Sequence, residues 1–85
     1  DLGPLQVAVE ANPKDHEARY NLALALYAGG QAEAAIDALI EIIRQDRGWN
    51  DDAARLELLK LFEAIGPTDP VTMDGRKKLS SILFS

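Results

Sequence analysis

Apolar residues recur along this chain three and four positions apart, a spacing that predicts amphipathic α-helices rather than β-strands. The segment His16–Ala28 carries two such apolar rows, with alanines between them. The rows are Leu22 with Leu26, and Tyr20 with Leu24 and Tyr27. A helix that is apolar nearly all round needs cover on more than one side. One side can take the next helix of the chain, and the other needs a further helix, another domain or a partner.

Helix-capping and helix-breaking residues divide the chain into five predicted helices. The predicted N-caps of the second, fourth and fifth helices are Asp15, Asn50 and Asp69. Breaks are expected at Asn12-Pro13, Gly29-Gly30, Arg47–Trp49 and Gly66-Pro67. The predicted helices cover residues 1–11, 16–28, 31–45, 50–65 and 70–84. Because alanine and leucine supply most of the apolar residues, the composition also favours an all-α fold.

The apolar residues of the third predicted helix recur elsewhere in the chain with the same spacing. The row Ala35, Leu39, Ile42 and Ile43 has one copy before it, at a step of 34, and one copy after it, at a step of 40. The two copies are Asp1, Leu5, Ala8 and Val9, and Gly75, Leu79, Ile82 and Leu83. A glycine inside a helix costs about 1 kcal/mol relative to alanine, so Gly75 is expected to allow two helix backbones to approach closely. Helix pairs at a period of 34 predict a tetratricopeptide-like, right-handed helical-hairpin solenoid.

The repeat predicts a single all-α domain over residues 1–85. Residues 1–13 are interpreted as a truncated first repeat, residues 16–49 as a full repeat and residues 50–85 as a degenerate C-terminal helix pair. The apolar residues of the fourth helix fall into two rows, one with Leu56, Leu59, Phe62 and Ile65, the other with Leu58 and Leu61. The lone Trp49 is expected to pack beneath this fourth helix, with an exposed position that binds a partner as the alternative.

Residues 16–49 resemble the tetratricopeptide pattern at Leu22, Ala23, Ala35 and Leu39, and depart from it at Arg19, Leu26 and Arg47. The tail, RGWNDDAARLELLKLFEAIGPTDP followed by GRKKLSSILFS, resembles the C-terminal domain of bacterial thioredoxin-like proteins with tetratricopeptide repeats, the YbbN-like co-chaperones. The chain begins at DLGPL without an initiator methionine and is expected to be a piece of a longer protein. The resemblance implies an upstream thioredoxin-fold domain, a cytoplasmic setting and transfer of unfolded clients to a chaperonin.

Composition removes several classes of function. With no cysteine, the chain offers neither a disulfide nor thiol redox chemistry, and a net charge of −5 argues against nucleic-acid binding. No apolar run reaches the roughly 20 residues of a membrane span. No nucleophile motif, phosphate-binding glycine loop or cluster of metal ligands is present in the sequence, so we expect a non-catalytic domain without cofactor or metal.

Two groups of residues are candidate protein-binding positions. The first lies on the groove-lining side of the second helix, and the second lies at the end of the last helix. They are Glu17, Tyr20, Asn21, Leu24 and Tyr27, and Leu79, Leu83 and Phe84. The expected occupant is an unfolded client, a chaperonin or the protein's own thioredoxin domain. The alternatives are plain core packing and a purely structural domain that mediates homodimerisation.

A carboxylate clamp is a further interpretation of the second helix. Arg19 with Asn21, and Arg55 at the position equivalent to Asn21 in the next repeat, could hold the C-terminal carboxylate of a bound peptide. Such a clamp needs several basic side chains along the groove. Because lysine and arginine are absent from most of these positions, the sequence disfavours it.

Overall fold

The computed structural model describes residues 2–84 and contains five α-helices with no β-strand in that range. The helices are α1 (Gly3–Ala11), α2 (His16–Ala28), α3 (Ala32–Gln45), α4 (Trp49–Ile65) and α5 (Pro70–Leu83). The all-α prediction is confirmed, and the helices begin and end within two residues of the predicted positions. Of the predicted copy of the apolar row in the first helix, Asp1 lies outside the described residues, and Leu5, Ala8 and Val9 lie half-buried on α1.

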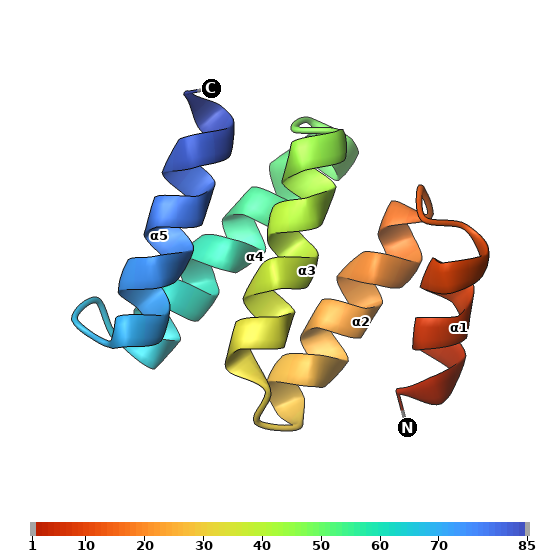
Figure 1. Ribbon diagram of the computed structural model, residues 1–85, viewed down its shortest axis with the longest axis horizontal. Helices are drawn as coiled ribbons and strands as arrows, with labels where there is room; N and C mark the ends of the chain where they lie inside the picture. Colours follow the sequence, from red (N-terminus) through yellow and green to blue (C-terminus); the bar gives the residue numbers. More distant parts are fainter. Residues whose placement is uncertain (1, 85) are drawn as a thin grey trace.

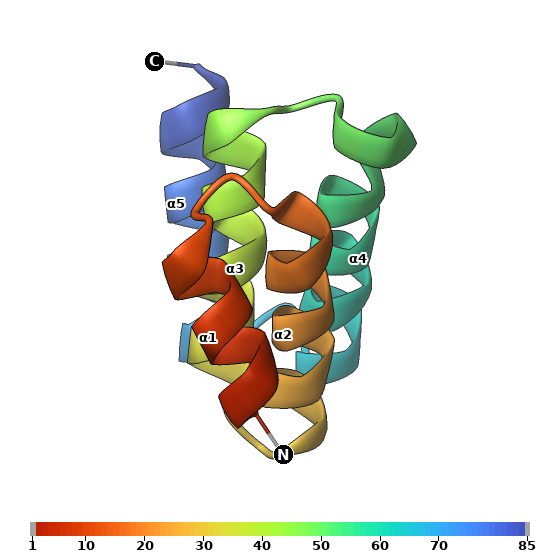
Figure 2. The ribbon, with the colours of Figure 1, turned by 90° about the vertical axis from the view of Figure 1, so that its right-hand side faces the viewer.

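The helices form two layers that the chain visits alternately. Figure 2 shows α2 and α4 in one layer and α1, α3 and α5 in the other. Successive helices therefore make antiparallel hairpins, and α3 lies at the centre, where it packs against α2, α4 and α5 (Figure 1). This arrangement is the helical-hairpin fold that the period of 34 predicts.

The core is built around α3, whose apolar row is buried as predicted. The other helices contribute residues at helical spacing to the same core. The buried core residues are Ala35, Ile36, Leu39, Ile42 and Ile43 of α3, Ala23 and Leu26 of α2, Ala54, Leu58, Leu61 and Phe62 of α4, and Leu79 of α5.

Two of the three predicted N-caps are confirmed. The Asp15 carboxylate accepts a hydrogen bond from the backbone N–H of Ala18 at 3.0 Å, and Asp69 accepts one from Val71 at 2.9 Å. Each bond satisfies a backbone donor that the first turn of a helix leaves without an intrahelical partner. The starts of α2 and α5 are therefore fixed by the local sequence.

The predicted N-cap at Asn50 is wrong. Asn50, Asp51 and Asp52 have φ angles of 49°, 54° and 64°, which place three consecutive residues in the left-handed region. Regular right-handed helix continues from Ala53, and no side chain caps this helix by a hydrogen bond. Asparagine and aspartate tolerate the left-handed conformation better than other non-glycine residues, so these side chains permit a sharp turn instead of capping a helix.

The first predicted apolar row of α4 is divided by the fold. Leu56 is 49% exposed and Leu59 is 43% exposed, whereas Phe62 is buried. The face that packs into the core carries Ala54, Leu58, Leu61 and Phe62. The position of α3 selects this face, and the sequence of α4 alone does not distinguish it because apolar residues lie on two sides of the helix.

Candidate protein-interaction surfaces

The first surface is a cleft of about 480 Å³ where the start of α2 meets the start of α4. We call it the α2/α4 cleft. Its lining residues are Glu17, Tyr20, Asn21, Trp49 and Asn50. The structure thus brings together three of the predicted binding residues on α2 and adds two from α4. For Trp49 a binding position was the alternative interpretation, and Asn50 was predicted only as a helix cap.

Aromatic rings form one wall of the α2/α4 cleft. The Trp49 ring lies 5.5 Å from the Tyr20 ring and 6.1 Å from the His16 ring, measured between centroids. Trp49 is half-buried against the hydrophobic core, and its aromatic neighbours belong to α2. The left-handed turn at Asn50–Asp52 follows Trp49 directly. Trp49 therefore lies before this turn, and the regular right-handed part of α4 begins after it.

Tyr20 also joins α2 to the middle of α4 by a polar contact. Its hydroxyl donates a hydrogen bond of 3.4 Å to the carboxylate of Glu57. Burial of the ring raises the pKa of Tyr20, and the negative charge of Glu57 and this hydrogen bond raise it further. The phenol therefore stays neutral at physiological pH and serves as a donor beside the cleft.

The other two residues of the predicted row differ in exposure. Leu24 is 38% exposed, whereas Tyr27 is half-buried against the hydrophobic core. The row Tyr20, Leu24 and Tyr27 is consequently neither a free apolar surface along its whole length nor sealed by its own chain. The accessible part consists of the cleft at Tyr20 and the side chain of Leu24.

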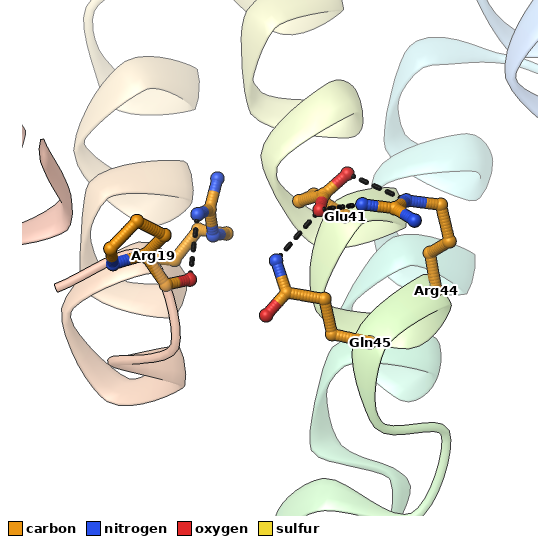
Figure 3. Close-up of polar contacts among 5 residues, drawn as sticks. Arg19, Glu41, Arg44 and Gln45 are labelled. Atoms are coloured by element: carbon orange, nitrogen blue, oxygen red, sulfur yellow. Dashed lines mark hydrogen bonds and ion pairs between the residues drawn. The ribbon is translucent and has the colours of Figure 1, made fainter.

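The basic residues of a carboxylate clamp are not in the α2/α4 cleft. The Arg19 guanidinium donates a hydrogen bond of 2.9 Å to the backbone carbonyl of Pro13, in the turn before α2 (Figure 3). Arg55 pairs with Asp52 one turn earlier on α4. Because both side chains have partners in their own chain and neither lines the cleft, the arrangement does not support a carboxylate clamp.

A polar network covers the end of α3 near Arg19. Figure 3 shows the Glu41 carboxylate between the side chains of Arg44 and Gln45, both of which donate hydrogen bonds to it. The hydrogen bonds from Arg44 are the main reason that the pKa of Glu41 is lowered, with burial acting in the opposite direction. This network stabilises the last turns of α3. Its residues line neither the α2/α4 cleft nor the second surface, which is described next.

The second surface is a groove of about 340 Å³ between α4 and α5, at the opposite end of the domain from α1 (Figure 1). We call it the terminal groove. Its lining residues are Leu59 and Phe62 of α4, and Arg76, Leu79, Ser80, Leu83 and Phe84 of α5 and the residue after it. The three predicted residues at the end of the chain all lie here, and Phe84 is 85% exposed.

Four residues of the terminal groove lie outside the predicted binding set, namely Leu59, Phe62, Arg76 and Ser80. Leu59 and Phe62 were assigned to an apolar row of their helix. Arg76 belongs to the basic run Arg76–Lys78, which the sequence predicts to be a solvated face, with docking of an acidic partner as the alternative. The Arg76 guanidinium carbon lies 5.7 Å from the centroid of the Phe62 ring, a cation–π contact. The step of 40 residues that relates α5 to α3 could have identified Arg76. It places this arginine at the position equivalent to Ile36, which is buried on α3.

Neither surface has the parts of a metal site. Within residues 2–84, no group of three or more histidine, cysteine, aspartate or glutamate side chains is arranged to hold a metal ion. None of the helices in that range is both long and apolar enough to cross a lipid bilayer.

Comparison with known families agrees with the fold. A family model described as tetratricopeptide repeat matches residues 1–84, nearly the whole chain. The chain belongs to the tetratricopeptide-repeat family. Repeats of this family generally mediate protein–protein interactions, and such domains are typically non-catalytic.

The chain is also similar to parts of longer bacterial proteins. An uncharacterized protein of Haemophilus influenzae is 30% identical over 84 residues, which is 99% of this chain and 38% of that protein. Uncharacterized proteins of Mycobacterium bovis and Mycobacterium tuberculosis are 35% identical over 51 residues, 60% of this chain and 17% of each relative. The chain therefore spans well under half the length of the curated relatives it matches.

Proposed function

We propose that this domain binds non-native segments of client proteins, as the interaction module of a thioredoxin-like co-chaperone. The binding surface is the α2/α4 cleft together with Leu24, which we call the α2/α4 face. The observation that carries the proposal is the exposed Leu24 beside a cleft walled by Tyr20 and Trp49. Aromatic and leucine side chains that remain accessible on a rigid helical face bind extended or helical apolar segments.

The composition of the α2/α4 cleft supports binding of unfolded chains better than binding of one small ligand. Apolar rings lie next to polar atoms of Glu17, Asn21 and Asn50, so the cleft can accept an apolar side chain and also the backbone groups that flank it. Transfer of the client to a chaperonin, and an upstream thioredoxin-fold domain in a cytoplasmic parent protein, are the parts of the proposal that rest on the resemblance to YbbN-like co-chaperones.

The test measures how far the chain suppresses aggregation of chemically denatured citrate synthase, followed by light scattering. We expect the unmodified chain to reduce scattering, and Leu24→Ser to weaken this activity several-fold without changing the helical circular dichroism. The matched control is Val7→Ser, because Val7 is 63% exposed but belongs to α1 in the other layer (Figure 2). Val7→Ser should retain the activity of the unmodified chain.

The purely structural alternative makes a different prediction in the same samples. If the α2/α4 face serves dimerisation, sedimentation velocity will show a dimer that Leu24→Ser dissociates, and the chain will not suppress aggregation. Equal loss of activity in Leu24→Ser and Val7→Ser would also contradict the proposal, since general surface hydrophobicity would then explain it.

A further inference from the structure

We propose that the terminal groove binds an amphipathic α-helix of a partner protein, and that this helix places a carboxylate against Arg76. The surface lies on the α4/α5 end of the domain and shares no lining residue with the α2/α4 cleft. The inference is therefore independent of the client-binding proposal.

The internal repeat indicates what shape of partner fits the terminal groove. On α3, Leu39 and Ile43 are fully buried in the core that α3 shares with α4. Their equivalents in the copy of this row on α5 are Leu79, which is 9% exposed and belongs to the core, and Leu83, which is half-buried. Both line the terminal groove, so part of this row stays open at its surface. An α-helix is the element that covers this pattern inside the domain, so the same pattern on α5 fits an α-helix from outside.

The residues that α4 buries define the expected pattern of the partner helix. They are Ala54, Leu58, Leu61 and Phe62, which occupy positions i, i+4, i+7 and i+8. A partner helix that lies on α5 as α4 lies on α3 presents a small residue at position i and apolar residues at positions i+4 and i+7. The residue at position i+8 has to differ from phenylalanine, because its neighbour in the groove is the charged Arg76.

Arg76 is the reason for this difference. In the register that relates α5 to α3 it is equivalent to Ile36, a buried side chain that lies beside the Phe62 ring where both approach Gly75. At the end of the domain the register therefore replaces an isoleucine by an arginine. Within residues 2–84, Arg76 forms no ion pair within 4.0 Å, and its described contact is with the Phe62 ring. A carboxylate at position i+8 of the partner helix satisfies this guanidinium.

Two exposed apolar residues bound the groove and add to the contact area. Phe84 is the most exposed large apolar residue described, and Leu59 of α4, 43% exposed, lines the same groove. Aromatic and arginine side chains in one groove are the combination most enriched at energetically important positions of protein interfaces. The net charge of −5 does not prevent an acidic contact here, because at physiological ionic strength surface charges beyond about 8 Å are largely screened.

The probe is a synthetic copy of residues 53–65 held helical by a side-chain lactam on its outward face. One version carries Phe62→Glu and the other Phe62→Lys, and binding to the 85-residue chain is measured by fluorescence anisotropy. We expect the glutamate peptide to bind about tenfold more tightly than the lysine peptide. Arg76→Glu in the chain should reverse this preference, and Leu59→Ser should weaken both peptides.

The matched control is Lys77→Glu, which changes charge by the same amount at a neighbouring position that does not line the groove. It should leave the ratio of the two affinities within about twofold of that for the unmodified chain. Absence of binding by either peptide, equal affinities for the two peptides, or an equal effect of Lys77→Glu and Arg76→Glu would overturn the proposal. A dimer of the chain that Leu59→Ser dissociates would also overturn it, since the occupant would then be a second copy.

Discussion

A β-carbon added to Gly75 of α5 would lie only 2.6 Å from Cε1 of Phe62 on α4, closer than two carbon atoms can approach without a shift. It would also lie 3.2 Å from Cγ2 of Ile36 on α3. Gly75 is thus the point at which three helices meet. Its lack of a side chain allows α5 to pack onto both neighbours, and Phe62, one of the residues it contacts, also lines the terminal groove.

We expect Gly75→Ala to destabilise the domain by about 1–3 kcal/mol through overpacking. At an exposed helical position the same change stabilises by about 1 kcal/mol, so the sign distinguishes close approach from simple helix propensity. Urea denaturation followed by circular dichroism measures the difference. A gain in stability would contradict the packing described here.

A double-mutant cycle locates the source of this penalty. Phe62→Leu removes the ring atoms nearest to Gly75 and will itself destabilise the core. In the Phe62→Leu background, however, Gly75→Ala should cost at least about 1 kcal/mol less than in the unmodified chain, because the two changes act on the same contact. Additive effects would place the strain at Ile36 instead.

The sequence predicted the centre of this fold well, for an identifiable reason. Helix α3 carries its apolar residues on one face, so periodicity determines which side chains become core. The register between α3 and α5 likewise indicated that Gly75 had a packing role. Helix α4 has apolar residues on two sides, and only its position against α3 decides that Leu58 is buried while Leu56 is exposed.

The start of α4 provides a further prediction. Asp51 has a φ of 54° and lies in the middle of three left-handed residues, where a β-carbon is unfavourable and glycine is not. We therefore expect Asp51→Gly to stabilise the domain by about 0.5–1 kcal/mol. Ala53→Gly, immediately inside the right-handed helix, is the control and should destabilise by about 1 kcal/mol. Destabilisation by both changes would mean that the backbone of Asp51 is right-handed helical in solution.

The same turn explains why the α2/α4 cleft could be predicted only in part. Sequence spacing placed Glu17, Tyr20 and Asn21 on one side of α2, and these residues do line the cleft. It did not join Trp49 and Asn50 to these residues, because an aspartate-rich helix start predicts capping, and no local signal indicated a left-handed turn. Residues positioned by an irregular backbone are the ones that periodicity misses.

The contact between Tyr20 and Glu57 leads to a titration experiment. Burial is the main cause of the raised pKa of Tyr20, and the Glu57 charge and hydrogen bond contribute the rest. We expect Glu57→Gln to lower the pKa of Tyr20 towards, but not fully to, the ordinary value of a tyrosine. Tyrosinate absorbance reports this in a Tyr27→Phe background, where Tyr20 is the remaining tyrosine. An unchanged pKa would show that the carboxylate does not interact with the phenol.

The Glu41 network predicts how stability depends on pH. Because its hydrogen bonds from Arg44 and Gln45 lower the pKa of Glu41 in the folded state, folding favours the ionised form of this carboxylate. Its contribution to the free energy of unfolding is therefore present above the unfolded pKa of a glutamate and is lost as the pH falls through the lower folded value. Arg44→Gln should accordingly reduce stability at neutral pH and have little effect in strong acid. Lys14→Gln removes the same charge from a residue outside the described ion pairs, and urea denaturation across pH should show no such acid-dependent difference for it. A loss of stability in Arg44→Gln that persists unchanged in acid would mean that the arginine acts through packing rather than through the Glu41 carboxylate.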